Sequence, residues 1–239
     1  MNFIYGCQKI SEGCDNCYID RRPWNLQLDK YEMETPFNAN VHYFDESKQI
    51  KKIDSFPENS IIWTNGLGDT FAEFIADSKR DRWHDIFESR PQYQFVICTK
   101  RPGLMLQYYK RHRVPDNVWV GTTAEMKRYI PRIELLKRID ARIRWISFEP
   151  LLEDMGDVNL KGIQWAAVGG ETEPNGRYRL FKEEWAWNLK QVCDRDSVKF
   201  WYEGGNGFSD AKRMVSGLFR NQDCQDYPLF RVSRQLSLV

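Results

Sequence analysis

Six short, nearly continuous apolar runs, separated by segments with helical periodicity, constrain the fold of this chain most strongly. Runs of this kind are typical of parallel strands that are covered on both faces. They span residues 61–63, 95–98, 118–120, 143–148, 165–168 and 200–202. The segments between them carry apolar stripes with the period of an α-helix. This alternation predicts β-α units with right-handed crossovers.

The predicted fold is therefore α/β, a partial (β/α) barrel of about six to seven parallel strands that is similar to a TIM barrel. The seventh strand is expected at residues 2–5, where it would lead into the cysteine loop. Helices are predicted over 78–89, 126–139 and 182–193, with a shorter one after Pro102 and another around 24–31. The length of 239 residues suits a single domain spanning 1–239, in which 204–239 form a looser C-terminal extension.

Composition sets limits on partners and location. The chain has 35 basic and 34 acidic residues, so no global field directs it toward nucleic acid or membrane. We find no signal-peptide pattern and no apolar stretch long enough to span a bilayer. The expected location is the cytoplasm, where reducing conditions disfavour disulfides and clustered cysteines are more often metal ligands.

Small, polar or charged residues follow each predicted strand directly. In a β/α barrel these strand ends converge on one rim, where active sites lie. We therefore expect the following side chains and glycines to share one cleft: Gly68, Asp69, Lys100, Arg101, Thr123, Glu125, Glu149, Gly169, Gly170, Glu171 and Glu203. The Lys100–Arg101 pair indicates an anionic partner, which an arginine can bind in bidentate fashion.

Three cysteines lie within the first seventeen residues: Cys7, Cys14 and Cys17, spaced C-x6-C-x2-C. One interpretation is a zinc site, which would need a fourth ligand from Cys98, Cys193, Cys224 or a histidine, none of them at the usual local spacing. The other is a [4Fe–4S] cluster held by three thiolates, with one iron left open for another molecule. Cys98 and Cys193 are expected to be small buried residues of a strand and a helix.

The cysteine loop and the strand ends together resemble the radical S-adenosylmethionine superfamily. More closely, the chain is similar to a phage-associated three-cysteine family of unassigned function. The matching segments are 6–18, 65–71, 98–102, 117–121, 147–151 and 168–171. The first gap of the cysteine motif has six residues here, where the commonest superfamily spacing has three.

The resemblance implies a [4Fe–4S] cluster on the three cysteines, S-adenosylmethionine as second cofactor, and an electron donor of flavodoxin or ferredoxin type. It places Gly68 and Asp69 at the methionine amino group. It places Thr123, Glu125 and Glu149 near the ribose, and Gly169 and Gly170 near the adenine. Lys100, Arg101, Glu171 and Glu203 are expected to face the substrate. A phage-encoded protein would work in the host cytoplasm.

Two other functions stay open at this point. The first is a zinc-stapled barrel without catalysis, which binds nucleic acid or a protein partner. Its phosphate contacts would make binding to nucleic acid weaken steeply with salt. The second is a metal-free hydrolase that uses Glu149 and Glu171 as paired carboxylates. The hydrolase hypothesis leaves the cysteine motif unexplained.

Overall fold

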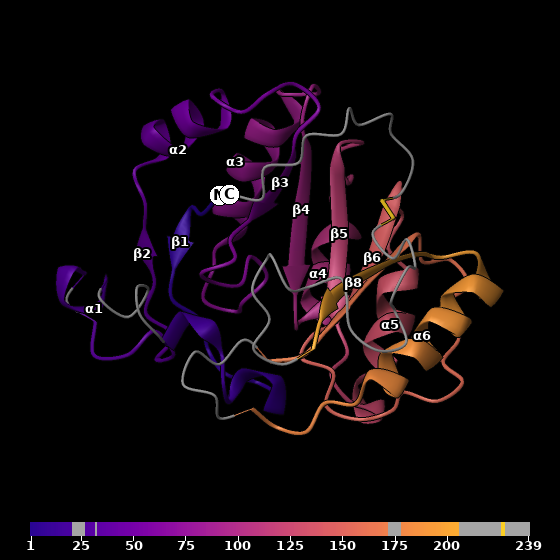
Figure 1. The fold of residues 1–239 in the computed structure, drawn as a ribbon. Coiled ribbons are helices and arrows are strands. Elements are labelled where there is room, and N and C mark those ends of the chain that lie inside the picture. Colours follow the sequence, from indigo (N-terminus) through magenta and orange to yellow (C-terminus); the bar gives the residue numbers. More distant parts are fainter. Residues whose placement is uncertain (21–26, 32, 172–177, 206–225, 228–239) are drawn as a thin grey trace.

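The core of the protein is a curled sheet of six parallel strands (Figure 1). The computed structural model describes residues 1–20, 27–31, 33–171, 178–205 and 226–227. Each strand pairs with the next one in the chain: β3 (Ile61–Thr64), β4 (Gln94–Thr99), β5 (Val118–Thr123), β6 (Ile143–Phe148), β7 (Trp165–Gly169) and β8 (Lys199–Gly204). The predicted partial α/β barrel and all six of its apolar strands are confirmed.

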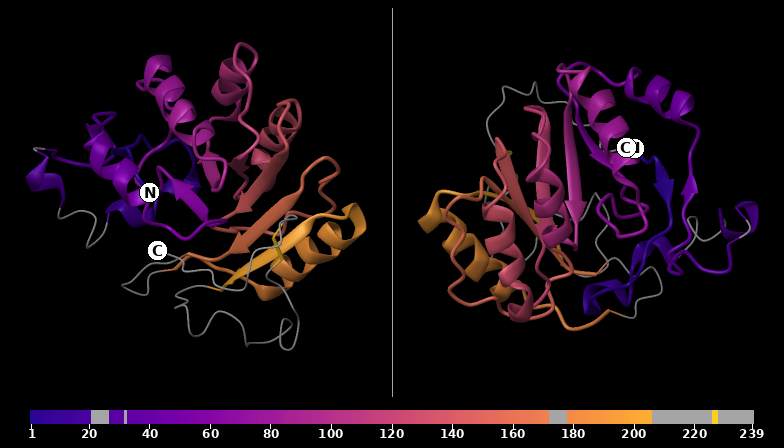
Figure 2. Two further views of the ribbon diagram at one scale, coloured as in Figure 1. Left: turned by 90° about the horizontal axis from the view of Figure 1, so that it is seen from above. Right: turned by 180° about the vertical axis from the view of Figure 1, so that it is seen from behind.

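Helices cover the outer side of this sheet (Figure 2). They are α3 (Asp77–Glu88), α4 (Pro102–Tyr109), α5 (Pro131–Lys137) and α6 (Glu183–Asp196). The helix predicted over 126–139 begins later than expected, because a 3-10 turn (Lys127–Tyr129) comes first and Pro131 then opens α5. The link from β6 to β7 crosses back without a helix.

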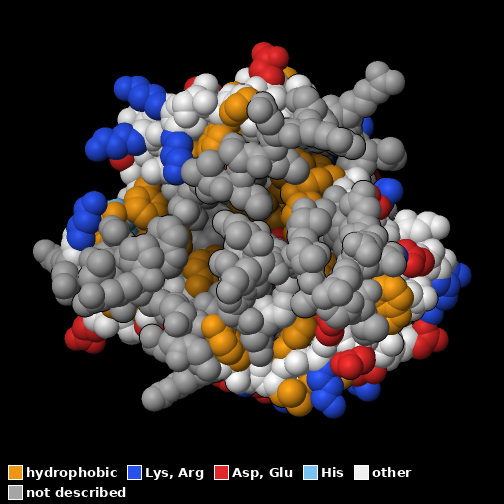
Figure 3. All heavy atoms as spheres, in the orientation of Figure 1, with side chains coloured by type: hydrophobic (Ala, Val, Ile, Leu, Met, Phe, Trp, Pro, Cys, Tyr) orange, Lys and Arg blue, Asp and Glu red, His pale blue; other side chains and the backbone are white. Residues whose placement is uncertain are grey.

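The two faces of the sheet are filled by different side chains. On β4, Phe95 and Ile97 pack into the large core under the helices, while Val96 belongs to a second cluster with Trp119 and Trp145. This alternation follows from the two-residue period of a strand. The second cluster also contains Trp165 and Trp201, so the inner side of the half-barrel is strongly aromatic. Some hydrophobic side chains of this face are visible between the grey atoms in Figure 3.

The amino-terminal strand differs from the expectation. β1 (Ile4–Tyr5) pairs antiparallel with β2 (His42–Tyr43) in a separate two-stranded sheet. The prediction of a seventh barrel strand at 2–5 was wrong in this respect. The segment still runs beside the end of β3, because the Asn65 backbone N–H donates to the Met1 carbonyl and Gly6 forms a parallel bridge with Gly68. This contact carries the cysteine loop to the rim of the sheet.

Two short helices lie between β1 and β3. α1 (Gln27–Lys30) falls inside the helix predicted around 24–31, of which 24–26 lie outside the described residues. α2 (Glu46–Ile53) was not predicted, although Asp45 caps it by accepting from the Lys48 N–H. Most of the predicted extension over 204–239 lies outside the described residues. No helix in the described part of the chain has the length and apolar character to cross a bilayer.

His84 of α3 is a buried neutral histidine in the core and gives a test of the fold. Its ring contacts the Arg80 carbonyl and the Tyr109 hydroxyl, each at 2.6 Å. Burial lowers its pKa from 6.5 to about 4. Between pH 6.5 and about pH 4 the imidazole is therefore protonated in the unfolded chain but neutral in the folded one. The free energy of unfolding falls as the pH drops through this range.

We expect the free energy of unfolding to decrease by about 2.5 kcal/mol between pH 7 and pH 4.5 on account of His84. Urea unfolding at the two pH values measures this decrease. In a His84→Gln variant the decrease should shrink by that amount. An unchanged pH dependence in the variant would contradict the assignment.

Candidate functional site

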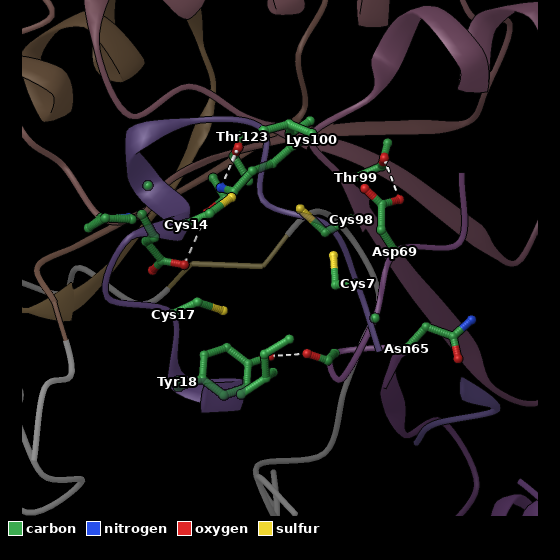
Figure 4. Close-up of a pocket in the computed structure, with 18 of the residues that line it drawn as sticks. Cys7, Cys14, Cys17, Tyr18, Asn65, Asp69, Cys98, Thr99, Lys100 and Thr123 are labelled. Atoms are coloured by element: carbon green, nitrogen blue, oxygen red, sulfur yellow. Dashed lines mark hydrogen bonds between the residues drawn. The ribbon is translucent and has the colours of Figure 1, made fainter. Parts of the chain in front are cut away.

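A cavity of about 410 Å³ opens at the carboxyl-terminal edge of the half-barrel (Figure 4). Its walls come from the cysteine loop and from the residues that follow the strands. It brings together most of the residues expected at the site: Cys7, Cys14, Cys17, Gly68, Asp69, Lys100, Arg101, Thr123, Glu149, Gly170, Glu171 and Glu203. Glu125 and Gly169 are the two expected residues that do not line it. The strand ends therefore converge as the topology requires.

The cysteine loop forms one wall of the cavity. It contains two 3-10 turns, Glu12–Cys14 and Tyr18–Asp20, which bend the chain back on itself. Figure 4 shows Cys7, Cys14 and Cys17 around the same space. Burial, followed by the nearby Asp69 carboxylate, raises the pKa of the Cys7 thiol to about 12. Binding of a metal at this thiol must therefore displace a proton.

Glu125 fixes this loop to the barrel. Its carboxylate is fully buried and accepts from the Ser11 hydroxyl at 2.6 Å. It also pairs with Lys100 at 2.6 Å and with Arg132 at 2.9 Å. Burial opposes the charge, but Lys100 and the hydrogen bonds outweigh it and hold the pKa of Glu125 below its usual value. A Cβ at Gly13 would lie 2.3 Å from the Glu125 carboxylate, so only glycine allows this approach.

The expected ribose contact of Glu125 is therefore not supported. Its oxygens are taken up by Ser11, Lys100 and Arg132, and the side chain stands behind the cavity wall. Thr123, the neighbouring candidate, does line the cavity, where its hydroxyl accepts from Lys100 at 2.9 Å. The position of the cysteine loop decides which strand-end carboxylates can face a ligand. This position could not be predicted from the sequence.

Asp69 lies near Cys7 in the cavity wall and is held there by hydrogen bonds (Figure 4). Its carboxylate accepts from the Thr99 hydroxyl at 2.6 Å and pairs with Arg101 at 2.8 Å. Arg101 also pairs with Glu73 at 2.9 Å. Burial opposes the charge of Arg101, but Asp69 outweighs it and raises the pKa of the guanidinium. Arg101 thus serves to orient Asp69 and is already neutralised by carboxylates of the protein.

The charges of the cavity wall are largely paired within the protein. Asp69, Glu149, Glu171 and Glu203 line it together with the cations Lys100 and Arg101. Lys100 pairs with Glu125, Arg101 with Asp69, and Glu171 with Arg179. The anionic partner that the Lys100–Arg101 pair indicated therefore stays a prediction.

Glu171 ties the far end of the cysteine loop to the rim. It accepts from the Asn16 amide at 3.1 Å and from the Arg179 backbone N–H at 2.7 Å. Burial opposes its charge, but the Arg179 hydrogen bonds outweigh it and lower the pKa of Glu171. Glu171 thus holds the loop as well as lining the cavity.

Gly169 brings two other carboxylates together. A Cβ at this position would lie 2.9 Å from the Glu203 Cβ and 3.2 Å from Oε1 of Glu149. Ser147 donates to Glu149 at 3.1 Å, and the Trp201 indole N–H donates to Glu203 at 2.7 Å. Gly169 is therefore explained by close packing behind the cavity, while its neighbour Gly170 lines it.

Aromatic rings contribute to the cavity wall, and the sequence reasoning did not assign them to the site. Trp63 and Trp145 line it and meet edge to face, with ring centroids 5.0 Å apart and planes at 88°. Tyr18 lines it as well, and its hydroxyl donates to the Gly66 carbonyl. Such a surface suits a planar ring of a ligand. The sequence held a sign of this, because the alternation of side chains along β3 and β6 puts Trp63 and Trp145 on the inner face of the sheet.

Cys98, which the sequence offered as one possible zinc ligand but indicated more strongly as a small buried strand residue, also lies at the cavity. It lies one position before the end of β4, is half-buried and lines the cavity, where the figure shows it near Cys7 (Figure 4). Burial raises the pKa of its thiol to about 12. The face on which Cys98 lies could be predicted from the sequence, because residues two apart in a strand share a face and Val96 lies on the inner one.

The cavity brings the three thiols of the cysteine motif to one wall. Among the described residues, no group of three or more His, Cys, Asp or Glu side chains is arranged to hold a metal ion. A zinc ion requires its thiolates at about 2.3 Å from one point. In an iron–sulfur cluster the thiolates bind different irons. The choice between a zinc site and a cluster therefore stays a prediction.

Comparison with known proteins gives a family. Residues 1–226 match the family described as "Protein of unknown function (DUF5131)". No curated protein and no solved structure matches the chain. The match spans the cysteine loop, all six strands of the half-barrel and the cavity. The chain therefore belongs to the DUF5131 family.

Proposed function

We propose that this protein is an iron–sulfur enzyme that reductively cleaves S-adenosylmethionine to start radical chemistry on a substrate. The observation that carries the proposal is the convergence of Cys7, Cys14 and Cys17 on one cavity with the polar ends of the parallel strands. The alternative is a zinc-stapled binding module, whose zinc would need a fourth ligand beyond the three cysteines of the motif. The near-zero net charge gives that module no support as a nucleic-acid binder.

In this proposal Cys7, Cys14 and Cys17 hold a [4Fe–4S] cluster, and S-adenosylmethionine binds at the iron that they leave open. When bound, the cluster supplies the electron that breaks a carbon–sulfur bond of S-adenosylmethionine, which yields methionine and a 5′-deoxyadenosyl radical. The protein positions the reactants and excludes water. An electron donor of flavodoxin or ferredoxin type is the expected partner.

The charges of the cavity suit this cofactor. S-adenosylmethionine carries a sulfonium and an ammonium group beside its carboxylate, and the carboxylates of Asp69, Glu149, Glu171 and Glu203 line the cavity. Asp69 is oriented by Thr99 and Arg101 to accept hydrogen bonds from the ammonium group. Glu149 and Glu203 are placed to meet ribose hydroxyls or a substrate, and Trp63 and Trp145 offer a surface for the adenine ring.

We expect the anaerobically purified protein to be brown, to absorb near ~400 nm and to contain about four irons and four sulfides per chain. Reduction by dithionite in the presence of S-adenosylmethionine should release 5′-deoxyadenosine. Chromatography of the products measures this release, and an unreduced sample is the control. A colourless protein with one tightly bound zinc, or a reduced cluster that leaves S-adenosylmethionine intact, would overturn the proposal.

A further inference from the structure

β4 delivers a fourth cysteine to the cavity that the cysteine loop encloses. Cys98 comes from the sheet, eighty residues beyond the motif, yet its side chain lines the same space as Cys7, Cys14 and Cys17. Figure 4 shows the four residues around one volume, with Cys98 between Cys7 and Lys100. Such convergence from two distant segments is the usual structural mark of a shared ligand set.

The register of the sheet turns Cys98 toward this volume. It pairs with Gly121 of β5, so no side chain stands beside it on that strand. Trp145 fills the neighbouring space, and its indole N–H donates to the Ile97 carbonyl at 3.1 Å. The thiol thus lies between an aromatic wall and the cavity.

Cys193 shows what a cysteine with a purely packing role looks like in this protein. It is fully buried in α6 and belongs to the main core under the helices. Cys98, by contrast, is only half-buried and borders the cavity. The apolar face of β4 that packs on the helices is occupied by Phe95 and Ile97, so Cys98 contributes nothing there.

We propose that Cys98 is a fourth thiolate ligand of the centre held by Cys7, Cys14 and Cys17, which occupies the open iron until S-adenosylmethionine displaces it. This inference rests on the proposed function. When the Cys98 sulfur binds iron, its proton passes to solvent. When S-adenosylmethionine binds, its amino and carboxylate groups replace the sulfur, which takes up a proton again. No electron is transferred in the exchange.

A closed resting site has a chemical consequence that can be measured. An iron with only three protein thiolates around its cluster is lost readily on oxidation, which leaves a [3Fe–4S] cluster with a characteristic electron paramagnetic resonance signal. A fourth thiolate retains that iron. The cluster of the wild-type protein should therefore resist oxidation as long as S-adenosylmethionine is absent.

The test uses the full-length protein reconstituted with iron and sulfide, and oxidised with ferricyanide without S-adenosylmethionine. The variants are Cys98→Ala and Cys98→Ser, with Cys193→Ala as the control for removal of a buried thiol. We expect the wild type and the control to keep about four irons, and both Cys98 variants to lose one and give the three-iron signal. Circular dichroism of each protein verifies that it is folded.

Equal iron loss in the wild type and the Cys98 variants would overturn the role of Cys98. Failure to assemble any cluster in the folded wild type would overturn it too, together with the proposed function. Two further outcomes distinguish the role of Cys98 from the proposed function. Selective iron loss without formation of 5′-deoxyadenosine supports Cys98 as a ligand and removes the proposed function. Formation of 5′-deoxyadenosine with equal iron loss in the wild type and the Cys98 variants supports the proposed function and removes Cys98 as a ligand.

Discussion

Replacing Cys14 and Cys17 together by alanine removes the iron–sulfur centre, and the protein is expected to purify colourless. Both thiols line the cavity, and Cys14 is the more deeply buried of the pair. With Cys98 nearby, a single substitution would leave three thiols at the site. The double variant leaves only Cys7 and Cys98, too few to hold a cluster. Iron should fall from about four per chain to background, and formation of 5′-deoxyadenosine with it.

Iron and sulfide analysis of the reconstituted double variant measures the loss, with Cys193→Ala as the matched control. The control removes a thiol that is more deeply buried than either Cys14 or Cys17 but lies in the helix-side core. It should keep its iron and its absorption near ~400 nm. A double variant that retains the colour and iron of the wild type would show that the cysteine loop does not hold the centre.

The barrel was readable from the sequence because its strands are buried on both faces. The run 165–168 is apolar throughout, which distinguishes it from a half-exposed strand. The two-residue strands β1 and β2 are too short to show any period, and their antiparallel pairing is a tertiary outcome. The amino-terminal segment therefore had the correct strand but the wrong partner.

Only those features of the site that follow from the topology of the sheet could be predicted from the sequence. Parallel strand ends meet at one rim, so the convergence of Asp69, Glu149 and Glu171 was predictable. Whether a given carboxylate faces ligand or protein depends on contacts made by distant residues. Glu125 is bound by Ser11 and Arg132, and nothing in the sequence near Glu125 marks them as its partners. The apolar neighbours of Cys98 on β4 indicate a buried strand residue, and the sequence alone does not reveal that its side chain lines the cavity.

The second large effect is expected at Glu125, which we infer to be a positioning residue for the cysteine loop. Its side chain has no exposed surface, and it joins Ser11 of the loop to Lys100 and Arg132 of the barrel. Removing one member of a buried ion pair leaves the partner charge buried and uncompensated, at a cost of about 3–5 kcal/mol. Glu125→Gln keeps the shape of the side chain and removes only the charge.

We expect Glu125→Gln to lower the free energy of unfolding by about 3 kcal/mol, measured by urea unfolding at pH 7. Glu134→Gln is the matched control, since that carboxylate is 60% exposed and pairs with Lys137 on the surface of α5. Exposed pairs contribute at most about 1 kcal/mol, so the control should stay close to the wild type. If the free energy of unfolding falls by the same small amount in both variants, the Glu125 carboxylate does not compensate the buried charges of Lys100 and Arg132.

The same variant separates positioning from ligation at the centre. Because Ser11 precedes Cys14 by three residues, loss of the Glu125 anchor frees the loop beside a cysteine. Glu125→Gln keeps all four cavity thiols, so the cluster should still assemble, but the iron should be lost faster on dilution into a chelator. Glu125→Asp, which restores the charge on a shorter stem, should slow that loss in part. A chelation rate that stays at the wild-type value in Glu125→Gln would remove Glu125 from the support of the site and leave it a purely structural ion pair.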